Sequence, residues 1–277
     1  MKVVYLGPEK TFTESKTKEL FPDEILVPLQ PIRKVIHSVE NNWADFGVVP
    51  LDNYYNGEVR ETLDSLIECK NTKIIRESSS KIVHCLGVLN KKNGIKEILS
   101  KDQALEQCSK YICNNYPDIN LIAVSSTAEA ISIISRENRI NSAAIASKSA
   151  IISMGLEILD EDICPNNKTR FIVIGKNILD SSGDDKTLLA IHPPVVDKPG
   201  VLYNSLKFFY DQEINLECIQ SRPDGKNGHY FYLEIIGHIK DRKVELALEN
   251  LCQYFNSELN NGVVKILGSY GNTRWKE

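Results

Sequence analysis

Short apolar runs alternate with longer segments of helical apolar spacing along the first two thirds of the chain. Strands are expected at residues 3–6, 46–50, 82–89, 121–124, 143–146 and 171–175, and helices at 13–20, 102–111 and 127–135. Alternation of this kind predicts an α/β fold with a mostly parallel sheet.

The alternating pattern runs through two rounds. We expect two similar α/β lobes, with the chain crossing between them near residues 76–81 and again near 158–170. Such an arrangement leaves a cleft between the lobes, and clefts of this kind bury small ligands well.

A different order of elements follows a polar linker at Asp180–Lys186, which is rich in turn-forming residues. Strands are expected at residues 187–191, 214–219, 230–236 and 263–268, and helices at 199–210 and 245–255. The order βαββαβ is that of a ferredoxin-like unit. We therefore predict two domains, at residues 1–179 and 187–277.

The composition excludes several classes of protein. The 277 residues are 42% hydrophobic and 25% charged, as in ordinary globular chains, and the formal net charge is −4. That balance, without a basic stripe, argues against a nucleic-acid partner.

Cofactor and targeting signals are missing as well. The seven cysteines are scattered, with no Cys-x-x-Cys and no Cys/His cluster at zinc spacing, so reduced thiols and no metal are expected. No glycine-rich phosphate loop or dinucleotide motif is present, and we expect no cofactor. The start of the chain is unlike a secretory signal, and no apolar stretch approaches the roughly 18 residues of a membrane span. We expect a cytoplasmic protein without membrane contact.

Candidate chemistry lies at Asn166–Gly175, where a polar turn leads into an apolar strand. The turn places the hydroxyl of Thr169 and the guanidinium of Arg170 at the beginning of that strand. Strand ends are where α/β proteins bind ligands. Taken alone, an arginine at a strand start is usually solvated, and a threonine there usually caps a turn. His84, within a strand-like run, is expected to be a core histidine.

Further blocks accompany this stretch in a fixed order: Leu6–Glu14, Gly47–Asn53, Gly57–Val59, Gln103–Cys108, Ser126–Ala130 and Ala143–Ser147. With these blocks the sequence closely resembles the prephenate dehydratases of phenylalanine biosynthesis, including their C-terminal regulatory ACT domain. The resemblance covers essentially the whole chain. It implies a bilobed catalytic region similar to periplasmic binding proteins, followed by a ferredoxin-like ACT domain.

The resemblance also implies a reaction, in which prephenate loses carbon dioxide and water to give phenylpyruvate. Thr169 would donate a hydrogen bond to the leaving hydroxyl. Arg170 would hold the pyruvyl carboxylate in a bidentate fork, because guanidinium and carboxylate geometries match. Further substrate-binding residues are expected at Thr11, Asn53, Ser126, Thr127, Asn167 and Phe171.

Several of these residues have an ordinary structural alternative. Thr11 and Asn53 lie at strand-to-loop junctions, where such residues form turns. Ser126 and Thr127 open a helix, where a cap and an anion site can coexist.

The C-terminal unit carries two segments that resemble the motifs framing the effector site of ACT domains. They are Gly200, Val201 and Leu202, and then Gln220, Ser221, Arg222 and Pro223. L-phenylalanine is the effector that the resemblance implies. ACT domains commonly pair edge to edge, so a homodimer or homotetramer is expected.

Four positions depart from the family pattern. The family usually has glycine where Lys10 stands, glutamate where Asp52 stands, serine where Tyr54 stands and glutamate where Gln220 stands. The departures at Lys10, Asp52 and Tyr54 leave open a preference for arogenate, or a diverged small-molecule binding or sensor protein without activity. With Gln220, one charge near the effector site is missing, so a weaker response to an amino acid is expected.

Overall fold

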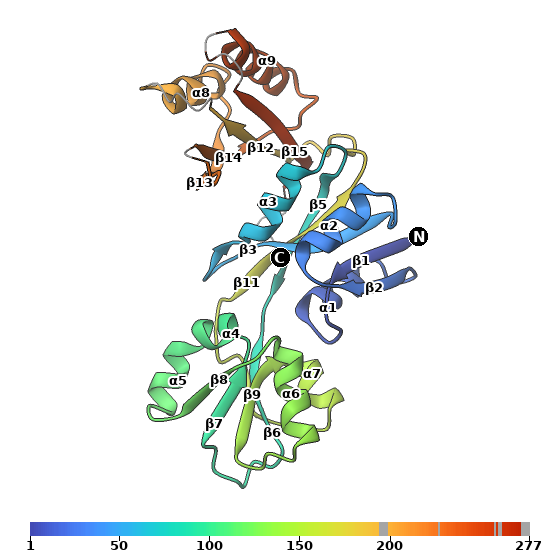
Figure 1. Ribbon diagram of the computed structural model, residues 1–277, viewed down its shortest axis with the longest axis vertical. Helices are drawn as coiled ribbons and strands as arrows, with labels where there is room; N and C mark the ends of the chain where they lie inside the picture. The colour runs from blue at the N-terminus through green and yellow to red at the C-terminus, as the bar shows by residue number, and fades with distance from the viewer. Residues whose placement is uncertain (194–198, 227, 258, 260–261, 273–277) are drawn as a thin grey trace.

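The computed structural model describes residues 1–193, 199–226, 228–257, 259 and 262–272. Three bodies follow one another along the long axis of the molecule, with the C-terminal domain at one end (Figure 1). We call the middle body lobe 1 and the body at the other end lobe 2. The last five residues of the domain expected at 187–277 lie outside the described residues.

Lobe 1 contains the chain start and two strands that connect it to lobe 2 (Figure 1). Its elements are β1 (Lys2–Leu6), α1 (Phe12–Leu20), β2 (Ile25–Leu29), α2 (Ile32–Glu40), β3 (Phe46–Asn53), β4 (Gly57–Glu58), α3 (Arg60–Glu68), β5 (Lys73–Lys81) and β11 (Lys168–Gly175). In α2, Ile32, Val35, Ile36 and Val39 are buried at helical spacing, so one apolar stripe attaches the helix to the sheet.

Lobe 2 is built on a five-stranded sheet in the order β10-β6-β9-β7-β8. Its elements are β6 (His84–Val88), β7 (Glu97–Ser100), α4 (Asp102–Gln107), α5 (Ser109–Asn115), β8 (Asn120–Ala123), α6 (Thr127–Arg136), β9 (Ser142–Ser147), α7 (Lys148–Ser153) and β10 (Glu157–Asp160). The chain enters lobe 2 between β5 and β6 and returns between β10 and β11. The second crossing lies within the expected residues 158–170, whereas the first follows directly after the expected residues 76–81, which belong to β5.

The C-terminal domain has the predicted βαββαβ order. Its elements are β12 (Asp185–His192), α8 (Val201–Tyr210), β13 (Leu216–Pro223), β14 (His229–Ile236), α9 (Arg242–Ser257) and β15 (Val263–Gly271). Residues 176–184 form the loop that connects lobe 1 to this domain.

One sheet runs through lobe 1 and the C-terminal domain, in the order β13-β14-β12-β15-β5-β11-β3-β1-β2 with β4 beside β3. The two parts meet where Gly268 of β15 pairs with Ile74 of β5. A Cβ on Gly268 would lie 2.4 Å from the Ile74 carbonyl oxygen, so the close approach requires glycine.

The core confirms that the two parts are packed as a unit. One cluster combines Val49 and Ile172 of lobe 1 with Leu188, Ala190 and Tyr232 of the C-terminal domain. The alternate residues Leu189 and Ile191 face α8 and α9 in a second cluster. Because both faces of β12 are covered, its residues Leu188–Ile191 are consecutive apolar residues.

The expectation of a mostly parallel sheet is wrong. In the large sheet β1 pairs parallel with β2 and β3, whereas β11 pairs antiparallel with both β3 and β5. The reason lies in the crossings, because β5 leaves lobe 1 and β11 re-enters it in the opposite direction. The C-terminal strands β12, β13 and β14 are also antiparallel neighbours.

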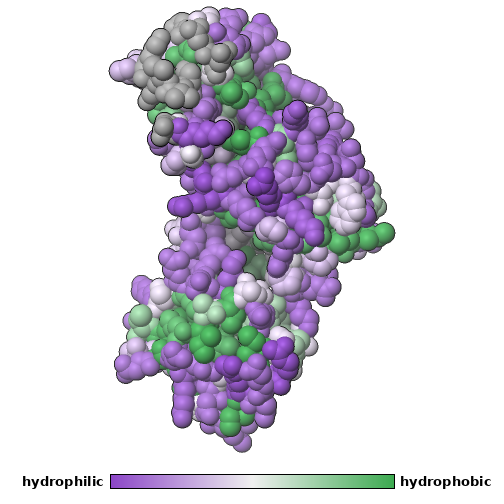
Figure 2. Space-filling view, in the orientation of Figure 1, coloured by the Kyte–Doolittle hydropathy of each residue, from purple (hydrophilic) through white to green (hydrophobic). Residues whose placement is uncertain are grey.

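The surface shown in Figure 2 is largely hydrophilic, with apolar side chains gathered into smaller areas, the most extensive of them on lobe 2. No helix within the described ranges combines the length and the apolar character that crossing a bilayer would take.

Candidate active site between the lobes

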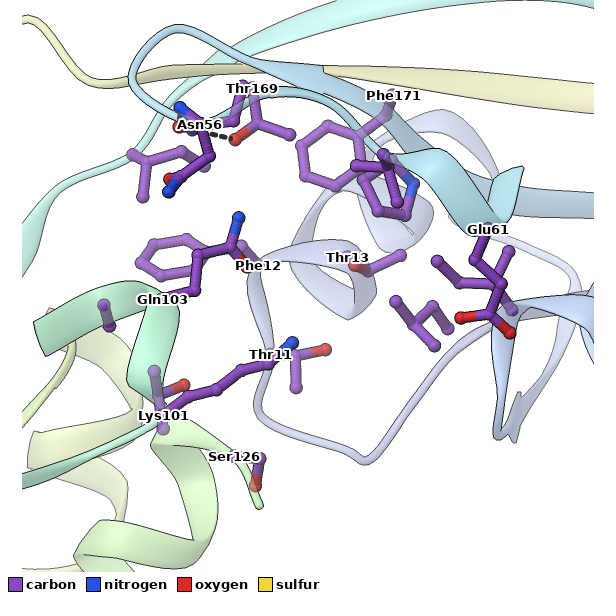
Figure 3. A pocket seen from close by; sticks show the side chains of 18 of the residues that line it. Thr11, Phe12, Thr13, Asn56, Glu61, Lys101, Gln103, Ser126, Thr169 and Phe171 are labelled. Atoms are coloured by element: carbon purple, nitrogen blue, oxygen red, sulfur yellow. Dashed lines mark hydrogen bonds between the residues drawn. The ribbon is translucent and has the colours of Figure 1, made fainter. Parts of the chain in front are cut away.

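A cavity of about 460 Å³ lies between lobe 1 and lobe 2. Figure 3 shows Thr169 and Phe171 of β11 on one side, with Thr11, Lys101 and Ser126 across from them. Six of the eight residues expected at the substrate site line it: Thr11, Asn53, Ser126, Thr127, Thr169 and Phe171.

The hydroxyl of Thr169 is held by Asn53. Nδ2 of Asn53 lies 2.9 Å from Oγ1 of Thr169, 2.7 Å from Oδ1 of Asn167 and 3.0 Å from the Lys168 carbonyl oxygen. The Thr169 oxygen therefore accepts a hydrogen bond from Asn53. Within the described part of the chain its own proton makes no hydrogen bond, so it is available to a ligand in the cavity.

The orientation of Asn53 follows from the backbone next to it. The N–H groups of Tyr55 and Asn56 lie 3.0 and 3.3 Å from its Oδ1, and a backbone N–H can only donate. Oδ1 must face them, which turns Nδ2 toward Thr169. Side-chain amides are otherwise ambiguous in orientation, and here the turn after β3 removes the ambiguity.

Gln107 extends this network to lobe 2. Its Nε2 lies 2.9 Å from Oδ1 of Asn53, so its Oε1 accepts from Nδ2 of Asn167 and from Nε2 of His84, both at 2.9 Å. Asn167 is fully buried and lies behind Asn53 instead of lining the cavity. It supports the site from behind, which differs from the direct substrate contact that the sequence predicts.

His84 is buried, as the sequence predicts, but it also lines the cavity. Burial lowers the pKa of His84 below its usual value, against the hydrogen bond to Gln107, which raises it. A neutral ring donating from Nε2 fits the acceptor that Gln107 presents. Its Nδ1 has no hydrogen-bond partner within the described residues.

Several helices begin at the cavity wall. The residues preceding α1, α2, α3 and α6 are Thr11, Pro31, Val59 and Ser126, and all four line the cavity. The side chains of Thr11 and Ser126 cap their helices by accepting from the backbone N–H groups of Glu14 and Glu129, at 3.3 and 3.0 Å. Helix N-termini carry partial positive charge, roughly half an elementary charge each, so this cavity suits an anion.

The charged side chains at the cavity are of both signs. Lys101, which is exposed and precedes α4, is the one Lys or Arg among the lining residues in the described part of the chain. Glu58 and Glu61 also line the wall. Glu61 accepts from the backbone N–H of Arg33 at 3.1 Å, which fixes it near the start of α2.

Arg170 contradicts the predicted substrate clamp. Neighbouring residues of a strand point to opposite faces, so Arg170 points away from the cavity that Thr169 and Phe171 line. Only 2% of it is exposed, and its Nη1 and Nη2 lie 2.9 and 2.8 Å from Oε2 and Oε1 of Glu234 in the C-terminal domain. Its bidentate fork is thus occupied by a carboxylate of the protein itself.

The departures from the family pattern lie outside the cavity lining. Lys10 has a left-handed backbone, with φ of 65°, which explains a glycine at this position in the family. Its Nζ lies 2.9 Å from Sδ of Met154 in lobe 2. Asp52 is buried, with Oδ2 3.4 Å from Nε of Arg170. Tyr54 is 63% exposed and packs edge-to-face on Tyr55.

The expected effector segments lie on the C-terminal domain, and none of their residues lines the cavity. Gly200, with φ of 91°, precedes α8, and Val201 is buried beneath it. Leu202 packs against the core of the domain, and Gln220, Ser221, Arg222 and Pro223 end β13. Nη2 of Arg222 lies 2.7 Å from Oδ2 of Asp64 in α3.

Sequence reasoning missed the parts that Gln103, Gln107, Lys101, Asn56 and Glu58 play in the cavity. A signal was present for Gln103 and Gln107, since residues four apart share one helix face. Within the described ranges, no group of three or more His, Cys, Asp or Glu side chains is placed to hold a metal ion.

Comparison with known proteins identifies the family. Residues 3–178 match the family described as prephenate dehydratase. The chain belongs to the prephenate dehydratase family.

Individual relatives extend the similarity beyond the matched residues. The bifunctional chorismate mutase/prephenate dehydratase of Aquifex aeolicus is 37% identical over 98% of this chain and 73% of its own length. The prephenate dehydratase of Methanocaldococcus jannaschii is 36% identical over 97% of both chains. The structure of the Arthrobacter aurescens prephenate dehydratase in complex with L-Phe covers 99% of this chain and 91% of its own, with a TM-score of 0.87 and 28% identity.

Proposed function

We propose that this prephenate dehydratase family member converts prephenate to phenylpyruvate, water and carbon dioxide in the cavity between its lobes. The ring carboxylate leaves as carbon dioxide, and its bonding electrons move through the ring to expel the hydroxyl. That hydroxyl needs a hydrogen bond or a proton as it departs.

The observation that carries the proposal is the geometry of Thr169. Its oxygen accepts from Asn53 at 2.9 Å, so its proton points to a partner other than Asn53. A threonine hydroxyl titrates far above neutral pH, so we assign it as a hydrogen-bond donor to the leaving oxygen. This bond strengthens as that oxygen gains charge, which is the condition for accelerating the reaction.

The carboxylates of prephenate then need partners other than Arg170. We assign them to the N-termini of α1, α2, α3 and α6 and to Lys101. Backbone N–H groups and a helix dipole bind a carboxylate without a guanidinium. A persistent charge on the pyruvyl carboxylate suits this fixed field, whereas the ring carboxylate must lose its charge.

The decisive experiment measures phenylpyruvate formed from prephenate by the parent protein and by Thr169→Val and Thr169→Ser. Valine keeps the shape and removes the hydroxyl, so kcat should fall by about 10²–10⁴ with KM little changed. Serine keeps the hydroxyl and should retain much of the rate. A parent protein that binds prephenate without turning it over would instead indicate the binding or sensor alternative.

Arogenate is a second candidate substrate, because Glu58 and Glu61 line the cavity. Arogenate carries an ammonium where prephenate carries a keto group, and a carboxylate pairs with an ammonium. Running both substrates in parallel, with Glu58→Gln and Glu61→Gln, separates the two possibilities. If either carboxylate holds the ammonium, its glutamine variant loses arogenate turnover selectively.

We further propose that the C-terminal domain is an ACT-type regulatory domain that binds L-phenylalanine through Gly200, Val201 and Leu202 and through Gln220, Ser221, Arg222 and Pro223. Support comes from the βαββαβ order and from the L-Phe complex of the similar Arthrobacter aurescens protein. Calorimetry with phenylalanine tests this on the intact protein, and absence of binding heat and of inhibition would remove the claim.

We propose that the protein forms a homodimer or homotetramer, because one edge strand of the large sheet is available for pairing. Strand β13 forms that edge, and Ile219 in it is 48% exposed. Unpaired strand edges are commonly covered by a second chain. Light scattering on the parent and on Ile219→Lys measures the assembly.

A cytoplasmic location is proposed as well, because all seven cysteines are free thiols.

A further inference from the structure

Arg170 belongs to a buried group of charges that joins lobe 1 to the C-terminal domain. We define the interdomain ion cluster as Arg170, Glu77, Lys186, Glu234 and Tyr270, each of which is 2% exposed or less. Arg170 and Glu77 come from β11 and β5 of lobe 1. The other three come from β12, β14 and β15 of the C-terminal domain.

Glu234 is the centre of the cluster. Besides the two bonds from Arg170, its Oε1 accepts from the Tyr270 hydroxyl at 3.0 Å and lies 3.4 Å from Nζ of Lys186. Lys186 is in turn 2.9 Å from Oε1 of Glu77. The carboxylate of Glu234 is therefore held from its own domain while it grips Arg170 by two parallel hydrogen bonds.

The ion pair between Arg170 and Glu234 lies next to the proposed catalytic residue Thr169. Arg170 follows Thr169 directly on β11, and the register between β11 and β3 shifts between Arg170 and Phe171. The shift interrupts the ladder on the β3 side of the strand, so next to Arg170 the regular ladder is the one to β5. The main-chain ladder from the C-terminal domain to lobe 1 is also short, with Gly268 and Ile74 as its registered pair.

We propose that Glu234 is a positioning residue for Thr169: by anchoring Arg170 it holds β11 so that the Thr169 hydroxyl stays at hydrogen-bond distance from the reacting substrate. The C-terminal domain thereby completes the support of a catalytic strand in lobe 1. This inference rests on the proposed role of Thr169 in prephenate turnover.

The proposal predicts a specific kinetic pattern. A displacement of about 1 Å in a positioned group can cost on the order of 10² in rate. Glu234→Gln replaces one acceptor oxygen by a donor and breaks the two-bond grip, so kcat for prephenate should fall at least tenfold. KM should change less than threefold, because the cavity wall that binds the carboxylates is separate from the cluster.

The test is a double-mutant cycle in the full-length protein with Glu234→Gln, Thr169→Val and the combination. If Glu234 acts through Thr169, Glu234→Gln should have little further effect once the hydroxyl is gone. Losses that simply multiply would overturn the proposal, and so would a folded Glu234→Gln variant with kcat within twofold of the parent. Glu234→Asp, which keeps the charge, should recover part of the rate and serves if the glutamine variant fails to fold.

Tyr270→Phe is the matched control. It removes one hydrogen bond from the same carboxylate but leaves both hydrogen bonds between Arg170 and Glu234 in place, so kcat should stay within twofold of the parent. A loss equal to that of Glu234→Gln would mean that the cluster merely stabilises the fold.

A second readout separates this inference from the proposed reaction. Hydrogen–deuterium exchange of the peptide containing β11 should be faster in Glu234→Gln than in the parent and unchanged in Tyr270→Phe. This result is expected whichever substrate the cavity accepts. If the parent forms no phenylpyruvate, the proposed function fails while the exchange data still decide the positioning role, and unchanged exchange in Glu234→Gln overturns it.

Discussion

The donors and acceptors of the polar network at the cavity are fixed one after another, starting from the turn after β3. Backbone N–H groups of that turn orient Asn53, Asn53 orients Gln107, and Gln107 leaves an acceptor for Nε2 of His84. Each step is set by which groups can donate, so the whole network favours one protonation state of the histidine. Burial disfavours an imidazolium here, and this effect outweighs the attraction of the Asp162 carboxylate, so the pKa of His84 is lowered.

A stability measurement should detect this preference. Burial lowers the pKa of His84 in the folded protein, so below the usual histidine value of about 6.5 the unfolded chain binds a proton that the folded chain resists. Stability attributable to His84 is therefore present above that value and is lost as the pH falls below it. The melting temperature should drop less between pH 7.5 and 5.5 in His84→Gln than in the parent.

The control for this prediction is His229, which is exposed. His229→Gln should leave the pH dependence of the melting temperature unchanged. Equal slopes for the parent and His84→Gln would contradict the assignment of a neutral buried histidine.

Tyr54 supplies a second prediction at the scale of one residue. Its side chain is 63% exposed and lies outside the cavity lining, although the neighbouring Asn53 is part of it. Tyr54→Ser, which restores the family residue, and Tyr54→Phe should both keep kcat and KM within about twofold. A marked change in either constant would place the phenol at the substrate after all.

At the scale of elements, the apolar pattern predicts most of the strands and helices that build the cleft. Thr169 and Phe171 belong to one face of β11 because they are two residues apart, and alternation alone sends Arg170 to the other face. Which face meets the substrate depends on what packs on each side. That is decided by Glu234 and Tyr270, which are more than sixty residues away along the chain.

The apolar pattern could not predict whether neighbouring strands of the sheet run parallel or antiparallel, for a similar reason. Apolar runs and helical spacing are the same whether a strand runs parallel or antiparallel to its neighbour. The antiparallel pairs of β11 with β3 and β5 arise from the two crossings between the lobes. Likewise, Gln107 of lobe 2 reaches Asn53 of lobe 1 only when the lobes face each other, and the spacing of residues along the chain does not predict that contact.

The junction of β15 with β5 gives a prediction for a single element contact. In Gly268→Ala the added Cβ would meet backbone and side-chain atoms of Ile74 at 2.4 and 2.5 Å, so the strands must move apart. Overpacking of this kind costs about 1–3 kcal/mol, and thermal unfolding should show a lower midpoint. Gly94→Ala is the control, because nothing lies within 4 Å of its added Cβ. Equal midpoints for the two variants would show that the junction tolerates separation.

At the scale of the whole molecule, the C-terminal domain contacts lobe 1 at a second place. Cys218 of β13 donates to Oε1 of Glu58, at 3.2 Å, and Arg222 pairs with Asp64 of α3. Glu58 and the residue preceding α3 both line the cavity. The strand that ends in the proposed effector segment is therefore connected directly to the cavity wall.

This connection predicts how phenylalanine would act at a distance. Allosteric coupling requires an element whose position both sites influence, and α3 meets that condition through Asp64. Asp64→Asn should weaken inhibition by phenylalanine about two- to fivefold, the range expected for a partly exposed ion pair worth up to about 1 kcal/mol. Turnover without phenylalanine should stay within twofold, since Asp64 lies outside the cavity lining. Asp180→Asn, which breaks the exposed pair of Asp180 with Lys240, is the matched control and should leave the inhibition curve in place. If Asp64→Asn and Asp180→Asn give the same inhibition curve as the parent, the effector signal reaches the cavity by a route other than α3.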